Sequence, residues 1–127
     1  MKDKNFYSEK RPWGGYTLFA DNEQCSVKTL EVSGQLSLQS HNYREESWHV
    51  ISGRIEVLRG PAFDNLDEIK KNLKTFVLSA GENIFIPVKH VHTIRNLGDN
   101  AALVLEVSKG KYLEDDIIRY EDIYGRM

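Results

Sequence analysis

Four side chains that can donate an electron pair to a metal ion occur in two segments of this chain, residues 34–53 and residues 81–96. Gln39, His41 and Glu46 lie within eight residues, in the segment from Gly34 to Gly53, and His92 comes from the second segment. Amide oxygen, imidazole nitrogen and carboxylate oxygen are all ligands for divalent ions such as Zn, Mn, Fe, Ni or Co. The residue types therefore indicate a metal site, provided that the fold brings His92 opposite the other three.

The segment from residue 36 to residue 43 has the alternation of a strand. Leu36 and Leu38 fall on one face, whereas Gln39, His41 and Tyr43 fall on the other, because successive side chains of a strand point to opposite faces. A row of polar side chains on one face indicates either exposure to water or a bound ligand. Alternation alone leaves both interpretations open.

Short strand-like segments separated by Gly, Pro or Asn turns make up most of the chain. We expect strands at residues 16–19, 26–32, 36–43, 48–51, 54–58, 75–78, 83–87, 92–96 and 102–107. A hairpin around Gly53 is expected to join two of them. The pattern is typical of an all-β sandwich or barrel. Residues 109–127 are expected to add a last strand or a short helix.

Two segments depart from the strand pattern. Residues 1–10 are polar and are predicted to form a loosely held arm. Residues 61–74 place Leu66, Ile69 and Leu73 near helical spacing, after Asp64 or Asn65 as a possible N-cap. We therefore predict a long hairpin insertion with a short helix around residues 64–73. It is interpreted as a surface excursion, with a lid or a dimer contact as the alternative.

Length and composition indicate one domain, spanning residues 1–127, with an ordinary hydrophobic core. Trp13 and Trp48 are assigned to that core. A net charge of −2 argues against a nucleic-acid partner. No apolar run reaches the ~18 residues of a membrane span, and no signal peptide is visible. The single cysteine, Cys25, excludes an internal disulfide. We expect a cytoplasmic protein with no membrane partner.

The spacing of the two segments resembles that of the two cupin motifs. In residues 34–53, a Gly is followed by His41, by Glu46 and, after six intervening residues, by Gly53. In residues 81–96, Gly81 is followed by Pro87, His92 and Asn96 with the second motif's spacing. The resemblance implies a cupin double-stranded β-helix, which is a jelly-roll barrel.

Longer matches resemble one family, the type II mannose-6-phosphate isomerase domain. The matching segments are RPWGGY (11–16), LSLQSHNYREESWHVISG (36–53), IPVKHVHTIRN (86–96) and DIIRYEDIYGR (116–126). That domain is usually the C-terminal part of bifunctional enzymes that also carry a mannose-1-phosphate guanylyltransferase.

The resemblance implies a metal-dependent aldose–ketose isomerase that interconverts mannose 6-phosphate and fructose 6-phosphate through an enediol. Its implied metal ligands are Gln39, His41, Glu46 and His92. Zinc is the first choice, with Mn, Fe, Ni or Co as alternatives. The implied partner is a small sugar phosphate, and a homodimer is expected from the family.

The residues that would move protons and bind phosphate are less defined. Tyr43, Lys89 and His90 are candidates for proton transfer, because they lie near the ligands in sequence. Phosphate requires Arg or Lys, and the candidates are Arg44, Arg95, Arg119 and Arg126. Arg44 and Arg126 are placed first because they lie in the matching motifs. For each arginine, a solvated surface charge is the alternative.

The chain departs from the family at four places. Tyr43 takes the place of the second cupin histidine, Lys89 takes the place of a glycine, and residues 61–74 replace a short turn. At a fourth place, Ser47 stands where the family often has a histidine beside the tryptophan. Two further functions therefore stay open. One is a cupin epimerase or isomerase of another sugar, working without metal through His41 and Tyr43. The other is a non-catalytic cupin that binds a metal or a sugar.

Overall fold

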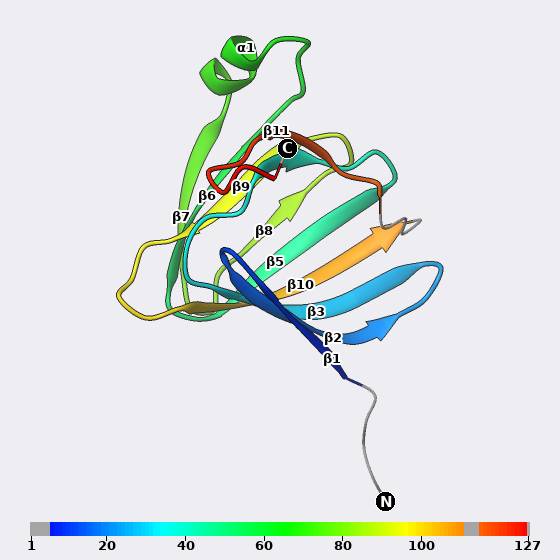
Figure 1. Ribbon diagram of the computed structural model, residues 1–127, viewed down its shortest axis with the longest axis vertical. Helices are drawn as coiled ribbons and strands as arrows, with labels where there is room; N and C mark the ends of the chain where they lie inside the picture. Colours follow the sequence, from blue (N-terminus) through cyan, green and yellow to red (C-terminus); the bar gives the residue numbers. More distant parts are fainter. Residues whose placement is uncertain (1–5, 111–114, 127) are drawn as a thin grey trace, which may run out of the picture.

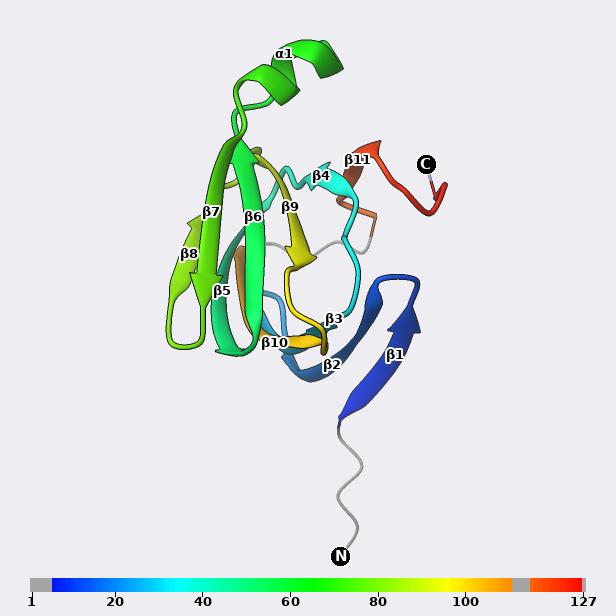
Figure 2. The ribbon, with the colours of Figure 1, turned by 90° about the vertical axis from the view of Figure 1, so that its left-hand side faces the viewer.

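The protein is a sandwich of two antiparallel β-sheets with a short helix at one end (Figures 1 and 2). The computed structural model describes residues 6–110 and 115–126. The all-β prediction is confirmed. The one helix of the described residues, α1 (Leu66–Lys71), is six residues long, and no helix among them could cross a membrane.

From β3 to β11 the chain passes back and forth between the two sheets, as in a jelly roll, except that β6 and β7 lie in the same sheet. The first sheet runs in the order β1 (Tyr7–Arg11), β2 (Gly14–Asp21), β3 (Cys25–Val32), β10 (Ala102–Gly110), β5 (Arg44–Ser52) and β8 (Asn83–Ile86). The second runs in the order β11 (Ile118–Glu121), β4 (Leu38–Ser40), β9 (Val91–Asn96), β6 (Arg54–Gly60) and β7 (Lys74–Ser79).

The interior of the sandwich is apolar at one end. Val50 of β5 lies opposite Val104 of β10, and Leu30 of β3 lies opposite Val104 on the other side. These side chains are buried together with Ile55 and Ile94 of the facing sheet. Burial of such side chains supplies most of the stability of a small domain. Trp13 and Trp48 are also buried, as predicted.

The interior becomes polar toward the other end of the same strands. In β5, the inward positions after Val50 are Trp48, Glu46 and Arg44, read toward the start of the strand. In β10, Glu106 lies opposite Trp48, and Ser108 lies opposite Glu46. Trp48 therefore marks the boundary between the hydrophobic core and a buried polar region.

The turn at Gly53 does not form the predicted hairpin. β5 pairs with β10 and β8, whereas β6 pairs with β7 and β9. The chain therefore crosses from one sheet to the other at this turn. Gly53 has a φ of +89°, and a Cβ atom there would lie 2.9 Å from the Cα of Ala102. Glycine is needed both for the backbone conformation and for the close approach of β10.

The helical insertion is confirmed between β6 and β7, which do form a hairpin. Asn65 is the N-cap, because its side-chain oxygen accepts a hydrogen bond from the backbone N of Glu68 at 3.0 Å. Ile69 is buried beside Leu38 and Val91, in a second apolar cluster. The helix stands at one end of the sandwich (Figure 2).

Both ends of the chain form strands. The predicted loose arm of residues 1–10 is wrong for Tyr7–Arg11, which form β1 and pair with β2. Residues 1–5 lie outside the described residues. The predicted last strand is β11, which pairs with β4 and contributes Arg119 next to Gln39.

A pair of glycine variants tests the crossing at Gly53. Gly53 and Gly81 share a φ of +89°, but a Cβ on Gly81 would meet no atom within 4 Å. Gly81→Ala should therefore cost only the left-handed backbone strain, about 1–2 kcal/mol. Gly53→Ala should cost a further ~1–3 kcal/mol from overpacking against Ala102. Urea denaturation of both variants measures the difference, and equal costs would contradict the close approach.

Candidate metal centre

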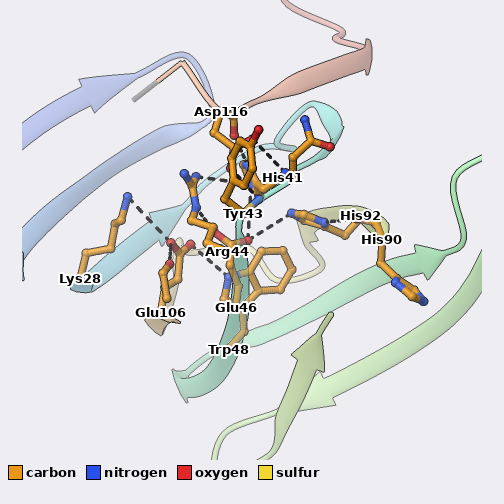
Figure 3. Close-up of polar contacts among 12 residues, drawn as sticks. Lys28, His41, Tyr43, Arg44, Glu46, Trp48, His90, His92, Glu106 and Asp116 are labelled. Carbon is orange, nitrogen blue, oxygen red and sulfur yellow. Dashed lines mark hydrogen bonds and ion pairs between the residues drawn. The ribbon is translucent and has the colours of Figure 1, made fainter. Parts of the chain in front are cut away.

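Three buried side chains form a compact His–Glu–His group in the polar region. His41 follows β4, Glu46 lies in β5 and His92 lies in β9. One ligand atom from each lies within 4.8 Å of the others. Figure 3 shows the two imidazoles directed toward the carboxylate. The fold therefore brings His92 opposite the first segment, as the sequence required.

Gln39 lies beside this group. It is the Cα partner of His92 in the pairing of β4 with β9. Its side chain is buried and lines the same cavity as His41 and Glu46. Gln39 therefore shares a cavity with two members of the group, and an amide oxygen is a ligand type that divalent ions accept.

Both imidazoles are oriented by backbone carbonyl groups. Nδ1 of His41 lies 2.6 Å from the carbonyl oxygen of Asp116, and Nδ1 of His92 lies 2.9 Å from that of His90. A carbonyl oxygen can only accept, so Nδ1 carries the proton in each ring. Nε2 of each neutral ring therefore presents a lone pair toward Glu46. Metal-binding histidines commonly have this arrangement.

The lone pairs of these groups converge, and Arg44 is a donor at their edge, with Nη2 lying 3.4 Å from Nε2 of His41. Nε2 of His92 lies 3.2 Å from Oε1 of Glu46, and Nε2 of His41 lies 3.7 Å from the same oxygen. Within the described part of the chain, Nε2 of His92 is buried and makes no hydrogen bond. Buried polar atoms are normally satisfied. A divalent cation satisfies all three, so the residues present fit a metal ion.

The environment favours the metal-binding protonation state. Burial lowers the pKa of His41 to about 4, with the charge of Glu46 opposing this shift and that of Arg44 adding to it. Burial opposes ionisation of Glu46, but His92, His41 and Arg44 outweigh it and lower the pKa of this carboxyl group. At neutral pH, His41 is thus neutral and Glu46 is charged, as ligation requires.

Hydrogen bonds made by its backbone groups hold the loop that carries His41 in place. The Asp116 carboxylate accepts hydrogen bonds from the backbone N of Asn42 and Tyr43, at 2.8 and 3.0 Å. The backbone N of Lys89 donates to the carbonyl of His41 at 2.7 Å. Lys89 has a φ of +64°, which explains why a glycine suits this turn. Lys89 adopts this backbone conformation itself, so the turn forms without a glycine.

A cavity opens next to the metal ligands and is rich in cations. Its lining includes the apolar Trp13, Leu30, Leu36, Trp48 and Ile117, and the polar or charged Arg11, Tyr16, Lys28, Ser37, Gln39, His41, Arg44, Glu46, Glu106, Arg119 and Arg126. Arg44 is the cation beside the ligands, with Nε 3.4 Å from Glu46 Oε2. Hydrogen bonds from Arg126 lower the pKa of Asp122 to about 2 and hold that guanidinium in place.

Of the predicted phosphate-binding arginines, three line this cavity. They are Arg44, Arg119 and Arg126. Arg95 does not line it. It is exposed and pairs with Glu56 at 2.9 Å on the outside of the second sheet.

The three predicted proton-transfer residues do not line the cavity. Tyr43 is 56% exposed, because β4 ends at Ser40 and a bend replaces the predicted strand. The prediction that Tyr43 shares a face with Gln39 is therefore wrong. Lys89 is exposed and His90 is half-buried, and Figure 3 shows His90 directed away from Glu46.

Three charged residues of the cavity, Arg11, Lys28 and Glu106, were missed by the sequence analysis. Lys28 and Glu106 come from neighbouring strands, β3 and β10, and their charged atoms lie 3.8 Å apart. Glu106 alternates with Leu105 and Val107, so the pattern of β10 suggests that the glutamate faces outward. Ala102 and Val104 lie on the same face of β10 as Glu106, and both are fully buried. These two apolar residues are the sequence signal that could have indicated an inward-facing Glu106.

Comparison with known proteins shows the family. A model of the family described as "Mannose-6-phosphate isomerase C-terminal" matches residues 2–122. The chain belongs to this family. It spans about a quarter of the length of the curated relatives that it matches.

Two relatives of this mannose-6-phosphate isomerase C-terminal domain are named for alginate or xanthan biosynthesis, and a third is named as a guanylyltransferase. The alginate biosynthesis protein AlgA of Pseudomonas putida is 38% identical over 126 residues, which is 97% of this chain and 24% of that protein. The xanthan biosynthesis protein XanB of Xanthomonas campestris is 39% identical over 91% of this chain and 23% of its own length. A mannose-1-phosphate guanylyltransferase of Escherichia coli is 34% identical over 91% of this chain and 23% of its own.

Solved structures confirm the cupin fold. The capsular polysaccharide assembling protein CapF of Staphylococcus aureus matches with a TM-score of 0.72 and 21% identity, over 92% of this chain and 34% of its own. The oxalate decarboxylase of Lactobacillus farciminis matches with a TM-score of 0.73 and 21% identity, over 91% and 33%.

The pKa of His41 predicts an acid-sensitive fold in the metal-free protein. The folded-state pKa of about 4 lies below the ~6.5 of an unfolded histidine, so the unfolded chain binds the proton more tightly. Stability from this group is present above pH ~6.5 and is lost as the pH falls toward 4, by up to ~3 kcal/mol.

Denaturant titrations between pH 7.5 and 4, with a chelator present, measure this loss. A His41→Gln variant should show a shallower pH dependence over this window, whereas His49→Gln, outside the cavity, should keep the full slope. A wild-type free energy of unfolding that stays constant from pH 6.5 to 4.5 would contradict the assignment.

Proposed function

We propose that this domain is a metal-dependent sugar-phosphate isomerase that interconverts mannose 6-phosphate and fructose 6-phosphate. The observation that carries the proposal is the buried His–Glu–His group, which opens onto a cavity rich in cations. The name of the matched family supports the substrate. A bound divalent ion would supply Lewis-acid polarisation of the substrate's carbonyl and hydroxyl oxygens.

Gln39, His41, Glu46 and His92 would hold that ion. Two imidazoles and a carboxylate match the ligand set of catalytic zinc sites, so zinc is our first choice, with Mn, Fe, Ni or Co as alternatives. The hydrogen bonds from Nδ1 of His41 and His92 to backbone carbonyl groups orient both rings before any ion binds.

Arg119 and Arg126 would bind the phosphate group. Both guanidinium groups line the cavity. Within the described residues, Nε of Arg119 is buried and has no hydrogen-bond partner. A phosphate oxygen satisfies such a donor with a charge-assisted hydrogen bond. Binding there would fix the sugar with its reacting carbons toward the ligands.

Arg44 would stabilise charge at the reacting end. Its guanidinium lies 3.4 Å from both Glu46 and His41. A fixed cation next to the site of an enediolate stabilises the negative charge that develops on its oxygens.

The metal-free epimerase is a weaker alternative on this geometry. It needs His41 and Tyr43 to act on one substrate, but Tyr43 is exposed and lies outside the cavity. A non-catalytic cupin that binds a metal or a sugar is tested directly by the experiments below.

The first experiment combines metal analysis with an activity assay. The purified protein should contain close to one divalent ion per chain and should convert mannose 6-phosphate to fructose 6-phosphate, with activity lost on chelation. His92→Ala should remove most of the metal and at least ~100-fold of the turnover, because it deletes a buried ligand. The matched control is His90→Ala, whose side chain lies away from Glu46 and which should keep both.

Two results would overturn the proposal. Wild-type protein without stoichiometric metal would rule out the metal-dependent reaction. Protein that holds metal but turns over no hexose phosphate would favour the non-catalytic cupin.

The phosphate assignment has its own pair of variants. Arg119→Met should raise the KM for mannose 6-phosphate about 10-fold or more, because a charge-assisted hydrogen bond contributes roughly 1.5–3 kcal/mol. Arg95→Met removes an arginine of the second sheet that faces solvent, and should leave the KM within about 2-fold. Steady-state kinetics at fixed ionic strength measure both. Equal effects of the two variants would reject Arg119 as a phosphate ligand.

A further inference from the structure

A second carboxylate, that of Glu106, lines the cavity but is not one of the metal ligands. Ser108 lies opposite Glu46 and Glu106 lies opposite Trp48, so the two glutamates form a diagonal pair on one face of the sheet. Diagonal neighbours of this kind are about 7 Å apart. Figure 3 shows Glu106 on one side of Glu46 and His92 on the other.

We propose that Glu106 is the catalytic residue that carries the proton between the two neighbouring carbons of the bound sugar phosphate. This inference rests on the proposed isomerase function and names the proton-transfer group of that site.

The Glu106 carboxylate is held in one orientation. Oε2 accepts a hydrogen bond from Nε1 of Trp48 at 3.1 Å, and Oε1 accepts one from Oγ of Ser108 at 3.2 Å. Nζ of Lys28 lies 3.8 Å from Oε1. A carboxylate has about four acceptor positions, so these partners leave lone pairs for a substrate hydrogen. Only 5% of the residue is exposed, and the cavity supplies its access to small molecules.

The other titratable groups of the described cavity lining are less suited to this step. His41 and Glu46 are assigned to the metal. The lysine and the arginines are cations, with no acceptor lone pair. Tyr16 donates its hydroxyl hydrogen to Glu9 at 2.7 Å, and burial together with this bond raises the pKa of Tyr16. Glu106 is therefore the base that the described lining offers.

The electrostatics of the cavity suit a base. Burial raises the pKa of Glu106, and the charge of Glu46 adds to this, while Lys28 and the Trp48 hydrogen bond oppose it. A carboxyl group with a raised pKa is a better proton acceptor near neutral pH. Glu46, with its lowered pKa, remains an ionised ligand. Two carboxyl groups whose pKa values are shifted in opposite directions can take the separate roles of ligand and base.

The proposed step balances within the substrate and one carboxylate. Glu106 takes the hydrogen on C2 of the aldose as a proton, and the electrons of the C–H bond form the C1–C2 double bond of the enediol. The electrons of the carbonyl π bond move to the oxygen on C1, which receives the proton from the hydroxyl on C2. Glu106 then returns its proton to C1, and the ketose forms at C2.

The test is a Glu106→Gln variant of the metal-loaded protein, compared with Glu56→Gln on the outer face of the second sheet. Glutamine keeps the shape of the side chain and an acceptor for Trp48, but it cannot take a proton from carbon. We expect unchanged metal content, a Kd for fructose 6-phosphate within about 3-fold, and turnover reduced by about 10²–10⁴-fold. Glu56→Gln should keep full turnover.

Exchange of the carbon-bound hydrogens of the sugar with solvent measures the proton-transfer step directly. In deuterium oxide, the wild type should incorporate deuterium into the carbon-bound positions of fructose 6-phosphate, as followed by NMR, and Glu106→Gln should not. If the glutamine variant does not fold, Glu106→Asp keeps the charge and moves the carboxylate back by one methylene. That variant should bind metal normally and exchange at least 10-fold more slowly.

The outcomes separate the two proposals. A wild-type protein with metal but without turnover or exchange overturns the isomerase function, and the role of Glu106 with it. An active wild type together with a Glu106→Gln variant that keeps more than a tenth of the turnover and exchange overturns the role of Glu106 alone. Exchange that is as fast in Glu106→Asp as in the wild type also overturns it.

Discussion

Two buried imidazoles and one carboxylate direct their lone pairs toward one another beside the guanidinium of Arg44, and the rest of the structure supports this arrangement. His41 and His92 each use Nδ1 to bind a backbone carbonyl, so both Nε2 atoms are left toward Glu46. Such a group is costly to bury without a cation. The surrounding sheets must hold it rigidly, and the apolar half of the sandwich supplies the stability.

The polarity of the interior changes along the strands rather than between the sheets. Val50 and Val104 lie at the apolar end, while Glu46 and Glu106 lie on the same faces of the same strands at the polar end. Trp48 stands between them, with its ring against His92 and its Nε1 bonded to Glu106. One aromatic side chain thus closes the core and orients a carboxylate of the cavity.

The alternation of apolar and polar residues within a strand identifies its core-facing side only where one face is plainly apolar. In β10, Leu103, Leu105 and Val107 form the more hydrophobic face, yet they are half-buried on the outside of the sandwich. Glu106 faces inward because β3 and β5 flank β10 with their own inward residues. No local pattern contains that information, since it depends on which strands become neighbours.

The sequence by itself determined the fold class and identified the candidate metal ligands. Residue types, spacing and turns predicted an all-β chain, a helical insertion between two paired strands, and Gln39, His41, Glu46 and His92 on one site. These are local properties, or properties of motifs whose spacing is constrained by strand geometry. The His–Glu–His group shows that the two segments meet as expected.

Only the tertiary structure decided which other residues share the cavity. The turn at Gly53 looks like a hairpin turn in sequence, but it passes the chain between sheets. Tyr43 follows the alternation of β4, but it leaves the site because the strand ends at Ser40. Lys28 and Glu106 are 78 positions apart in the sequence and meet because β3 pairs with β10. Strand pairing is a long-range choice made by packing and loop closure, and therefore short-range periodicity does not reveal it.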